Sequence, residues 1–181
     1  MNDERYEIAP LTAFGPHARC NLKRIFWETA ATREFPSTAE RCAYFMRWLG
    51  RYLDACPVDA FVATRKGQVM GYVAGCRDTA SVAAAPIIAD IWYYTADMLG
   101  HIRSFPSHFH VNVAPDAQGR GVGRALVAAF AQHCRAAGSP GLHVVTAADK
   151  QAAKFYVACG FDARGDFIAG ARRLCLYAIS L

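Results

Sequence analysis

The sequence predicts an α/β protein with a mixed, twisted central sheet of about six to seven strands and helices on both faces. Three observations lead to this class. Segments with apolar residues at strand spacing and at helical spacing alternate along the 181 residues. Residues 109–146 read as strand, glycine-rich loop, helix and strand, which is a right-handed crossover between parallel strands. The last two strands follow each other directly and would pair antiparallel, so the sheet is mixed.

The N-terminal part is expected to contain a strand followed by two helices. Residues 6–9 form the strand. A helix is expected over residues 14–31, where apolar side chains recur every three or four positions. A second helix begins at Ser37 or Thr38, both good N-cap residues, and ends before Pro57.

A β-hairpin is expected next, with strands at residues 60–64 and 69–74 around a tight turn at Lys66-Gly67. Residues 77–106 are less regular. Two aromatic or apolar groups in them are expected to be helical, Ile91-Trp92-Tyr93-Tyr94 and Met98-Leu99. Strands and helices then alternate over residues 109–113, 121–137, 142–146, 150–159, 161–168 and 172–179.

Composition points to a single domain, residues 1–181, because no linker or repeat divides the chain. The net charge of +5 comes from scattered basic residues, which disfavours nucleic-acid binding. The longest apolar run, residues 80–91, is too short to cross a membrane. The N-terminus lacks a signal-peptide pattern, and the seven cysteines form no C-x-x-C pair. We therefore expect a cytoplasmic protein without a metal site.

The most informative segment is a glycine-rich loop between an expected strand and an expected helix. The strand ends with Val111-Asn112-Val113, and the loop reads Gln118-Gly119-Arg120-Gly121-Val122-Gly123-Arg124. Glycines expose backbone N–H groups, and a helix N-terminus adds its own, so the loop is suited to a pyrophosphate. A dinucleotide G-x-G-x-x-G motif would need a third glycine at Arg124 or Leu126, and no Gly-Lys-Ser/Thr occurs.

The spacing Gln118-x-x-Gly121-x-Gly123 resembles the acetyl-CoA pyrophosphate loop, [QR]-x-x-G-x-[GA], of the GCN5-related N-acetyltransferases (GNAT). A second segment, from Asp149 through Phe155-Tyr156 to Gly160-Phe161, resembles the family's N-x-x-A-x-x-F-Y-x-x-x-G-F, with Asp149 in place of asparagine. Gly160 suits the C′ position of the preceding helix. The resemblance implies the GNAT fold over most of the chain, with its specific motifs in residues 108–161.

The resemblance also implies roles for individual residues. The strand around Val111 and Val113 would separate from its parallel neighbour and pair with the pantetheine arm. The loop residues would hold the pyrophosphate, and Phe155 and Asp149 would lie beside the cofactor. This cofactor-binding set is Val111, Val113, Gln118, Gly119, Arg120, Gly121, Val122, Gly123, Arg124, Asp149 and Phe155. Tyr156 matches the tyrosine that donates a proton to the departing thiolate in many members.

The general base has several candidates. His108, His110 and Asn112 alternate along one strand and so share a face, and histidine titrates near neutral pH. The segment from His108 to Pro115 is similar to the H-L-H-I-D-I-L-P run of the acetyltransferase-like domain of O-GlcNAcases and of bacterial relatives. Those proteins have an aspartate at the position of Asn112. Alternatively, His108 and His110 are hydrogen-bonded structural residues without a catalytic role. Asp90 and Asp97 are further candidates for the base or for contacts to the amine.

We expect an acetyl-CoA-dependent N-acetyltransferase that acts by direct attack of a primary amine, with a small-molecule amine as the acceptor. Aromatic residues at 92–94 and Phe105 are candidates for the acceptor pocket. The sequence is compatible with a homodimer and does not decide the oligomeric state. The main alternative is a catalytically weak acyl-CoA-binding or interaction module with the same fold, which the amide at Asn112 favours and Tyr156 disfavours.

Overall fold

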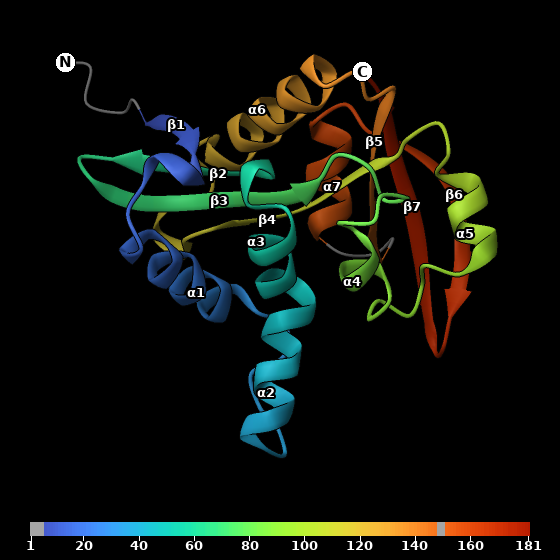
Figure 1. Cartoon of the computed structure of the whole chain (residues 1–181), viewed down its shortest axis with the longest axis horizontal. Coiled ribbons are helices and arrows are strands. Elements are labelled where there is room, and N and C mark those ends of the chain that lie inside the picture. Colours follow the sequence, from blue (N-terminus) through green and yellow to red (C-terminus); the bar gives the residue numbers. More distant parts are fainter. Residues whose placement is uncertain (1–5, 148–150) are drawn as a thin grey trace. The chain divides into compact units, whose positions relative to one another are not determined.

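The computed structural model describes residues 6–147 and 151–181. Its strands are β1 (Glu7–Pro10), β2 (Ala60–Arg65), β3 (Gln68–Cys76), β4 (Ser107–Val113), β5 (Gly141–Thr146), β6 (Asp162–Ala169) and β7 (Arg172–Ser180). Its helices are α1 (His17–Thr29), α2 (Thr38–Phe45), α3 (Arg51–Ala55), α4 (Ala85–Ile88), α5 (Ala96–His101), α6 (Val122–Ala136) and α7 (Gln151–Ala158) (Figure 1).

The strands hydrogen-bond in the order β1-β2-β3-β4-β5-β7-β6. Strands β4 and β5 are parallel, whereas β1–β2, β2–β3, β5–β7 and β6–β7 are antiparallel. The predicted mixed sheet is therefore confirmed.

The chain divides into two compact units. The first contains the residues up to Gly75 together with His110–Phe130, and the second contains Cys76–Phe109 and Ala131–Leu181. Strand β4 and helix α6 each contribute residues to both units, and the units are described separately below.

In the first unit, helices cover both faces of the strands. Tyr72 of β3 and His110 of β4 lie on the face that packs against Phe26 of α1. A Cβ on Gly71, the neighbouring residue of Tyr72, would meet Leu126 of α6 at 3.2 Å. Because successive side chains of a strand point to opposite faces, α1 and α6 cover opposite sides.

The same alternation orders the second unit. His108 of β4 packs against Tyr94, and the adjacent Phe109 packs against Tyr156 of α7. Tyr94 precedes α5, whose Met98 forms a buried cluster with Ile102 and Leu176 of β7. Helix α7 and the α4–α5 segment therefore lie on opposite faces of this part of the sheet.

Local sequence signals set several element boundaries. The Ser37 side chain accepts a hydrogen bond from Glu40 N at 3.2 Å and caps α2, as expected. Lys66 and Gly67 have φ of +50° and +77°, the conformation of a two-residue hairpin turn. After α7, the N–H groups of Gly160 and Phe161 donate to the carbonyls of Val157 and Tyr156, a Schellman C-terminus.

Two expectations differ from the structure. The second helix is not uniformly α-helical, because Met46–Gly50 form a π-helical turn between α2 and α3. Residues Trp92–Tyr94 are not helical but lie between α4 and α5. Tyr93 is buried and Tyr94 is held by a histidine of β5, so tertiary contacts decide this segment. No helix among the described residues is long and apolar enough to span a bilayer.

Candidate active site

The glycine-rich loop of the first unit has the geometry of an anion cradle. Gly119 and Gly121 adopt φ of +74° and +81°, a region that side chains disfavour. The first intrahelical bond of α6 joins Ala125 N to Gly121 O at 3.1 Å. The amides of residues 122–124 precede that bond and lack an intrahelical acceptor. Such amides, together with the helix dipole, favour a phosphate at this point.

Gln118 fixes the loop to the end of β4. Its Nε2 donates to the carbonyl oxygen of Val113 at 3.1 Å. The Ala114 N–H donates to Met70 O on β3, which anchors the segment on its other side. The exposed residues Arg120 and Arg124 place two positive charges on the loop and the first helical turn. Val111 and Val113 of the predicted set are half-buried on β4.

His110 lies in the first unit among aromatic rings. Its ring centroid is 6.2 Å from that of Phe26 and 6.3 Å from that of Tyr72. Burial lowers the pKa of His110 to about 4, so the imidazole is neutral at pH 7. Its Nδ1 is buried, as is the Tyr72 hydroxyl, and neither atom has a hydrogen-bond partner among the described residues.

Asn112 is tied to α1. Its Nδ2 donates to Oγ1 of Thr29, and the Thr29 hydroxyl donates in turn to the carbonyl of Ile25 at 2.7 Å. The amide thereby connects β4 to the last turn of α1, which is a structural contact.

His108 lies in the second unit in a different environment. Thr79 Oγ1 donates its single proton to the Pro106 carbonyl, so Nδ1 of His108, 2.8 Å away, must donate to Thr79 Oγ1. The side chain is 2% exposed. Burial and the neighbouring His143 hold the pKa of His108 well below its usual range.

His143 on β5 lies next to His108, and its hydrogen bonds fix its tautomer. Its Nδ1 donates to the Phe105 carbonyl at 2.5 Å, which leaves Nε2 to accept from the Tyr94 hydroxyl at 2.9 Å. Burial lowers the pKa of His143 to about 4. His108 and His143 thus form a neutral buried pair whose ring centroids are 5.5 Å apart.

Tyr156 is held within an aromatic cluster of the second unit. Its ring lies 6.0 Å from Phe109, 5.8 Å from Phe161 and 5.3 Å from Phe155. Burial, and secondarily Cys159, raise the pKa of the phenol above its usual value. Tyr156 therefore remains protonated at physiological pH and can donate a hydrogen bond. Asp149 lies outside the described residues.

A cavity of about 640 Å³ opens in the second unit between the α5 segment and the β6–β7 hairpin. It is lined by Trp92, Tyr93, Thr95, Asp97, Met98, His101, Leu176 and residues 164–170. Trp92, Tyr93 and Asp97 were named from the sequence. Tyr94 instead bonds His143, and Phe105 lies under the Arg164 guanidinium.

The sequence analysis did not identify three parts of these sites: Tyr72, His143 and the β6–β7 hairpin residues that line the cavity. Tyr72 and His143 stand in apolar strands, where a polar side chain was a usable signal. The hairpin residues gave none, because exposed residues of an edge hairpin look alike whether or not they line a cavity.

Comparison with known proteins gives a consistent result. The model of the acetyltransferase (GNAT) family matches residues 21–161. Among solved structures, SsHAT is 21% identical with a TM-score of 0.72, covering 97% of this chain and 98% of that one. PH1933 from Pyrococcus horikoshii OT3 is 13% identical with a TM-score of 0.71, and the alignment covers 98% of this chain and 99% of that one.

The yncA protein from Salmonella typhimurium, solved with its cofactor acetyl-CoA, is 19% identical with a TM-score of 0.59. The alignment covers 97% of this chain and 94% of that one. At these identities the structures establish a common fold. A search of curated proteins returned no match.

Proposed function

This chain is an acetyltransferase of the GNAT family, and from that premise we propose that it transfers an acetyl group from acetyl-CoA to a primary amine of a small molecule. The main support for acetyl-CoA as the donor is the loop at Gly119 and Gly121. The positive φ values of these glycines and the N-terminus of the following helix α6 suit a pyrophosphate. The acetyl-CoA bound to yncA supports the same donor for this chain.

The reaction proceeds by direct attack. The neutral amine nitrogen bonds to the thioester carbonyl carbon, and a backbone N–H of β4 near Val113 stabilises the negative charge on the carbonyl oxygen. The carbon–sulfur bond then breaks, and the thiolate leaves with the electron pair. Tyr156 donates a hydrogen bond and a proton to that sulfur. The proton lost from the amine passes to the general base.

Of the two histidine candidates, we assign the base to His110. His108 is almost fully buried, and its Nδ1 proton is committed to Thr79. His110 is half-buried and neutral at physiological pH, so it can accept a proton from a group at its accessible side. With a pKa near 4 it is a weak base, and it would act as a relay that passes the proton on to solvent.

The test is a CoA-release assay. The protein is incubated with acetyl-CoA and a panel of primary amines, and free CoA is measured with a thiol reagent while the acetylated amine is identified by mass spectrometry. Amine-dependent CoA release supports the proposal. Acetyl-CoA binding without release for any amine would instead support the acyl-CoA-binding module.

A further inference from the structure

We propose that Tyr72 is a positioning residue for His110: its phenol oxygen accepts a hydrogen bond from the Nδ1–H of His110 while Nε2 takes up the proton of the attacking amine. This inference rests on the proposed function and deepens it, because it adds a second residue to the base. Tyr72 belongs to no motif and stands within the apolar strand β3.

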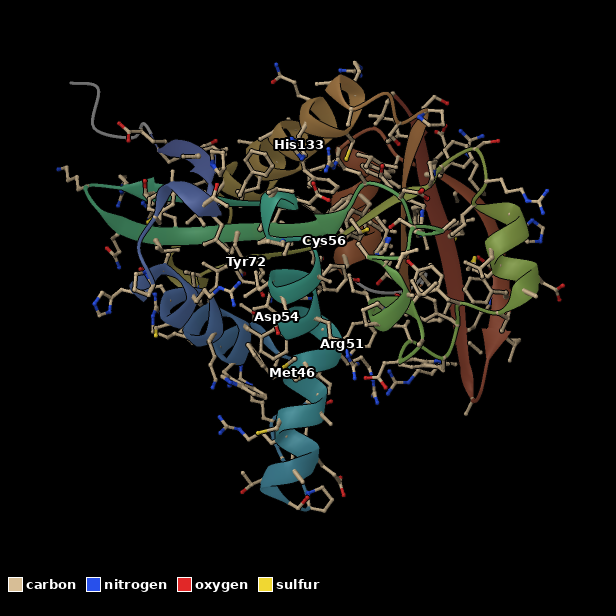
Figure 2. All side chains as sticks on the ribbon, viewed as in Figure 1. Met46, Arg51, Asp54, Cys56, Tyr72 and His133 are labelled. Carbon is tan, nitrogen blue, oxygen red and sulfur yellow. The ribbon has the colours of Figure 1, made fainter. Side chains whose placement is uncertain are left out.

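Tyr72 and His110 each bury a polar atom that lacks a hydrogen-bond partner. Tyr72 is 0% exposed on β3 (Figure 2), and His110 lies on the neighbouring strand β4. Neither the Tyr72 hydroxyl nor Nδ1 of His110 has a partner among the described residues. Buried polar groups are nearly always hydrogen-bonded, because desolvation without a partner costs stability. Two such atoms in adjacent side chains therefore require an explanation, and a bond that forms during the reaction supplies one.

The surroundings of His110 single out Tyr72 as the acceptor. Among the described residues, two rings contact His110, at centroid distances of 6.2 Å for Phe26 and 6.3 Å for Tyr72. Both distances lie in the range of interacting rings. Phenylalanine has no acceptor atom, and Asn112, which follows on the same face of β4, gives its amide N–H to Thr29. The phenol oxygen of Tyr72 is the remaining acceptor beside Nδ1.

The two nitrogens of His110 have different surroundings. Nδ1 is buried, and the half-buried ring leaves Nε2 on its accessible side. A base must offer its lone pair where the amine can reach it, so the resting proton is on Nδ1. When Nε2 accepts the amine proton, the ring becomes an imidazolium, and its Nδ1–H becomes a stronger donor.

The bond to Tyr72 is expected to tighten at that moment. Catalytic hydrogen bonds are often long in ligand-free structures and shorten in the reacting complex. A cation beside the apolar ring of Phe26 is costly unless a hydrogen bond compensates it, and Tyr72 does so without adding a charge. Burial raises the pKa of Tyr72 well above its usual value, so the phenol keeps its own proton throughout. The proton on Nε2 then passes to solvent.

The test is a double-mutant cycle of Tyr72→Phe and His110→Gln. CoA release is measured with acetyl-CoA and the most active amine of the panel described above. Tyr72→Phe is expected to lower kcat about 10-fold, the effect of losing a hydrogen bond to a charged group, and to change the KM of either substrate less than twofold. In the His110→Gln background it should change kcat less than twofold, because Tyr72 acts through His110.

Tyr52→Phe is the matched control. Tyr52 is buried in α3 of the same unit and is not one of the two ring neighbours of His110, so this variant should leave kcat unchanged. Equal fractional losses of kcat from Tyr72→Phe in the wild-type and His110→Gln backgrounds would overturn the proposal, because Tyr72 would then act independently of His110. An unchanged kcat in Tyr72→Phe would overturn it as well.

Nitrogen-15 NMR of the histidine side chains separates this inference from the proposed function, because it needs neither acetyl-CoA nor an amine. At pH 7, wild-type His110 should be protonated on Nδ1, with its signals identified by their loss in His110→Gln. In Tyr72→Phe the Nε2–H tautomer should gain population, because Nδ1–H then faces no acceptor.

That pair of spectra would support the pairing of Tyr72 with His110 even if no amine is acetylated. Wild-type His110 protonated on Nε2 would overturn the inference. Amine-dependent CoA release by the same preparation would then leave the proposed acetyl transfer standing.

Discussion

Tyr72 and His110 lie on neighbouring strands with ring centroids 6.3 Å apart, and each turns a buried polar atom inward without a hydrogen-bond partner among the described residues. Tyr72 is fully buried on β3 (Figure 2). A buried hydroxyl without a partner costs about 1–3 kcal/mol of stability. The pair therefore lowers the stability of the protein, and one of its two members, His110, is the residue assigned as the base.

Tyr72→Phe removes that hydroxyl and keeps the ring. We expect the free energy of unfolding to stay equal or to rise by about 1 kcal/mol in urea denaturation. Tyr94→Phe is the matched control, since it deletes a hydroxyl that donates to His143 at 2.9 Å and should lower stability by about 1 kcal/mol. A loss in Tyr72→Phe as large as that in Tyr94→Phe would show that Tyr72 has a partner.

The buried histidines predict a loss of stability in acid. His110 and His143 have folded-state pKa values of about 4, against 6.5 in an unfolded chain. Between these values the unfolded state binds more protons, so stability is full above about pH 6.5 and falls as the pH drops toward 4. The expected loss is about 3 kcal/mol for each histidine.

The measurement is urea denaturation at a series of pH values. His110→Gln removes one of the titrating groups and should flatten the dependence between pH 6.5 and pH 4. An unchanged slope in this variant would mean that His110 does not titrate abnormally.

Tyr156→Phe tests the proton donor. The raised pKa of Tyr156 keeps its hydroxyl protonated, and the variant loses that donor while retaining the ring that packs on Phe109. We expect kcat to fall about 100-fold, with the acetyl-CoA dissociation constant within twofold of wild type. An unchanged turnover number would remove Tyr156 from the mechanism.

Gly121→Glu tests the cradle. The variant places bulk and negative charge at a residue whose φ is +81°, in the loop where we propose that the pyrophosphate binds. Calorimetry should show no acetyl-CoA binding. Gly138→Glu is the control, because Gly138 has a similar φ of +79° and lies at the far end of α6. Equal losses in both variants would indicate general destabilisation.

The sequence by itself determined the elements whose signals are local. The Lys66-Gly67 turn and the Ser37 cap depend on the conformational preferences of a few consecutive residues. The loop at Gly119 and Gly121 does too, because only glycine adopts positive φ without strain. The spacing of Gln118, Gly121 and Gly123, together with the Phe155-Tyr156 and Gly160-Phe161 motif, also indicated the family.

Only the tertiary structure distinguished His108 from His110. The two alternate on one strand and look equivalent in the sequence, but their environments come from residues far along the chain. Thr79 and His143 surround the first, whereas Phe26 and Tyr72 surround the second.

The cavity has the same origin. Asp97 and Ile168 are more than sixty positions apart in sequence, and neither belongs to a motif. Local periodicity reports which face of an element is buried, but it does not report which distant element covers that face. The cavity and the charges around it arise from that pairing, so only the tertiary structure decided them.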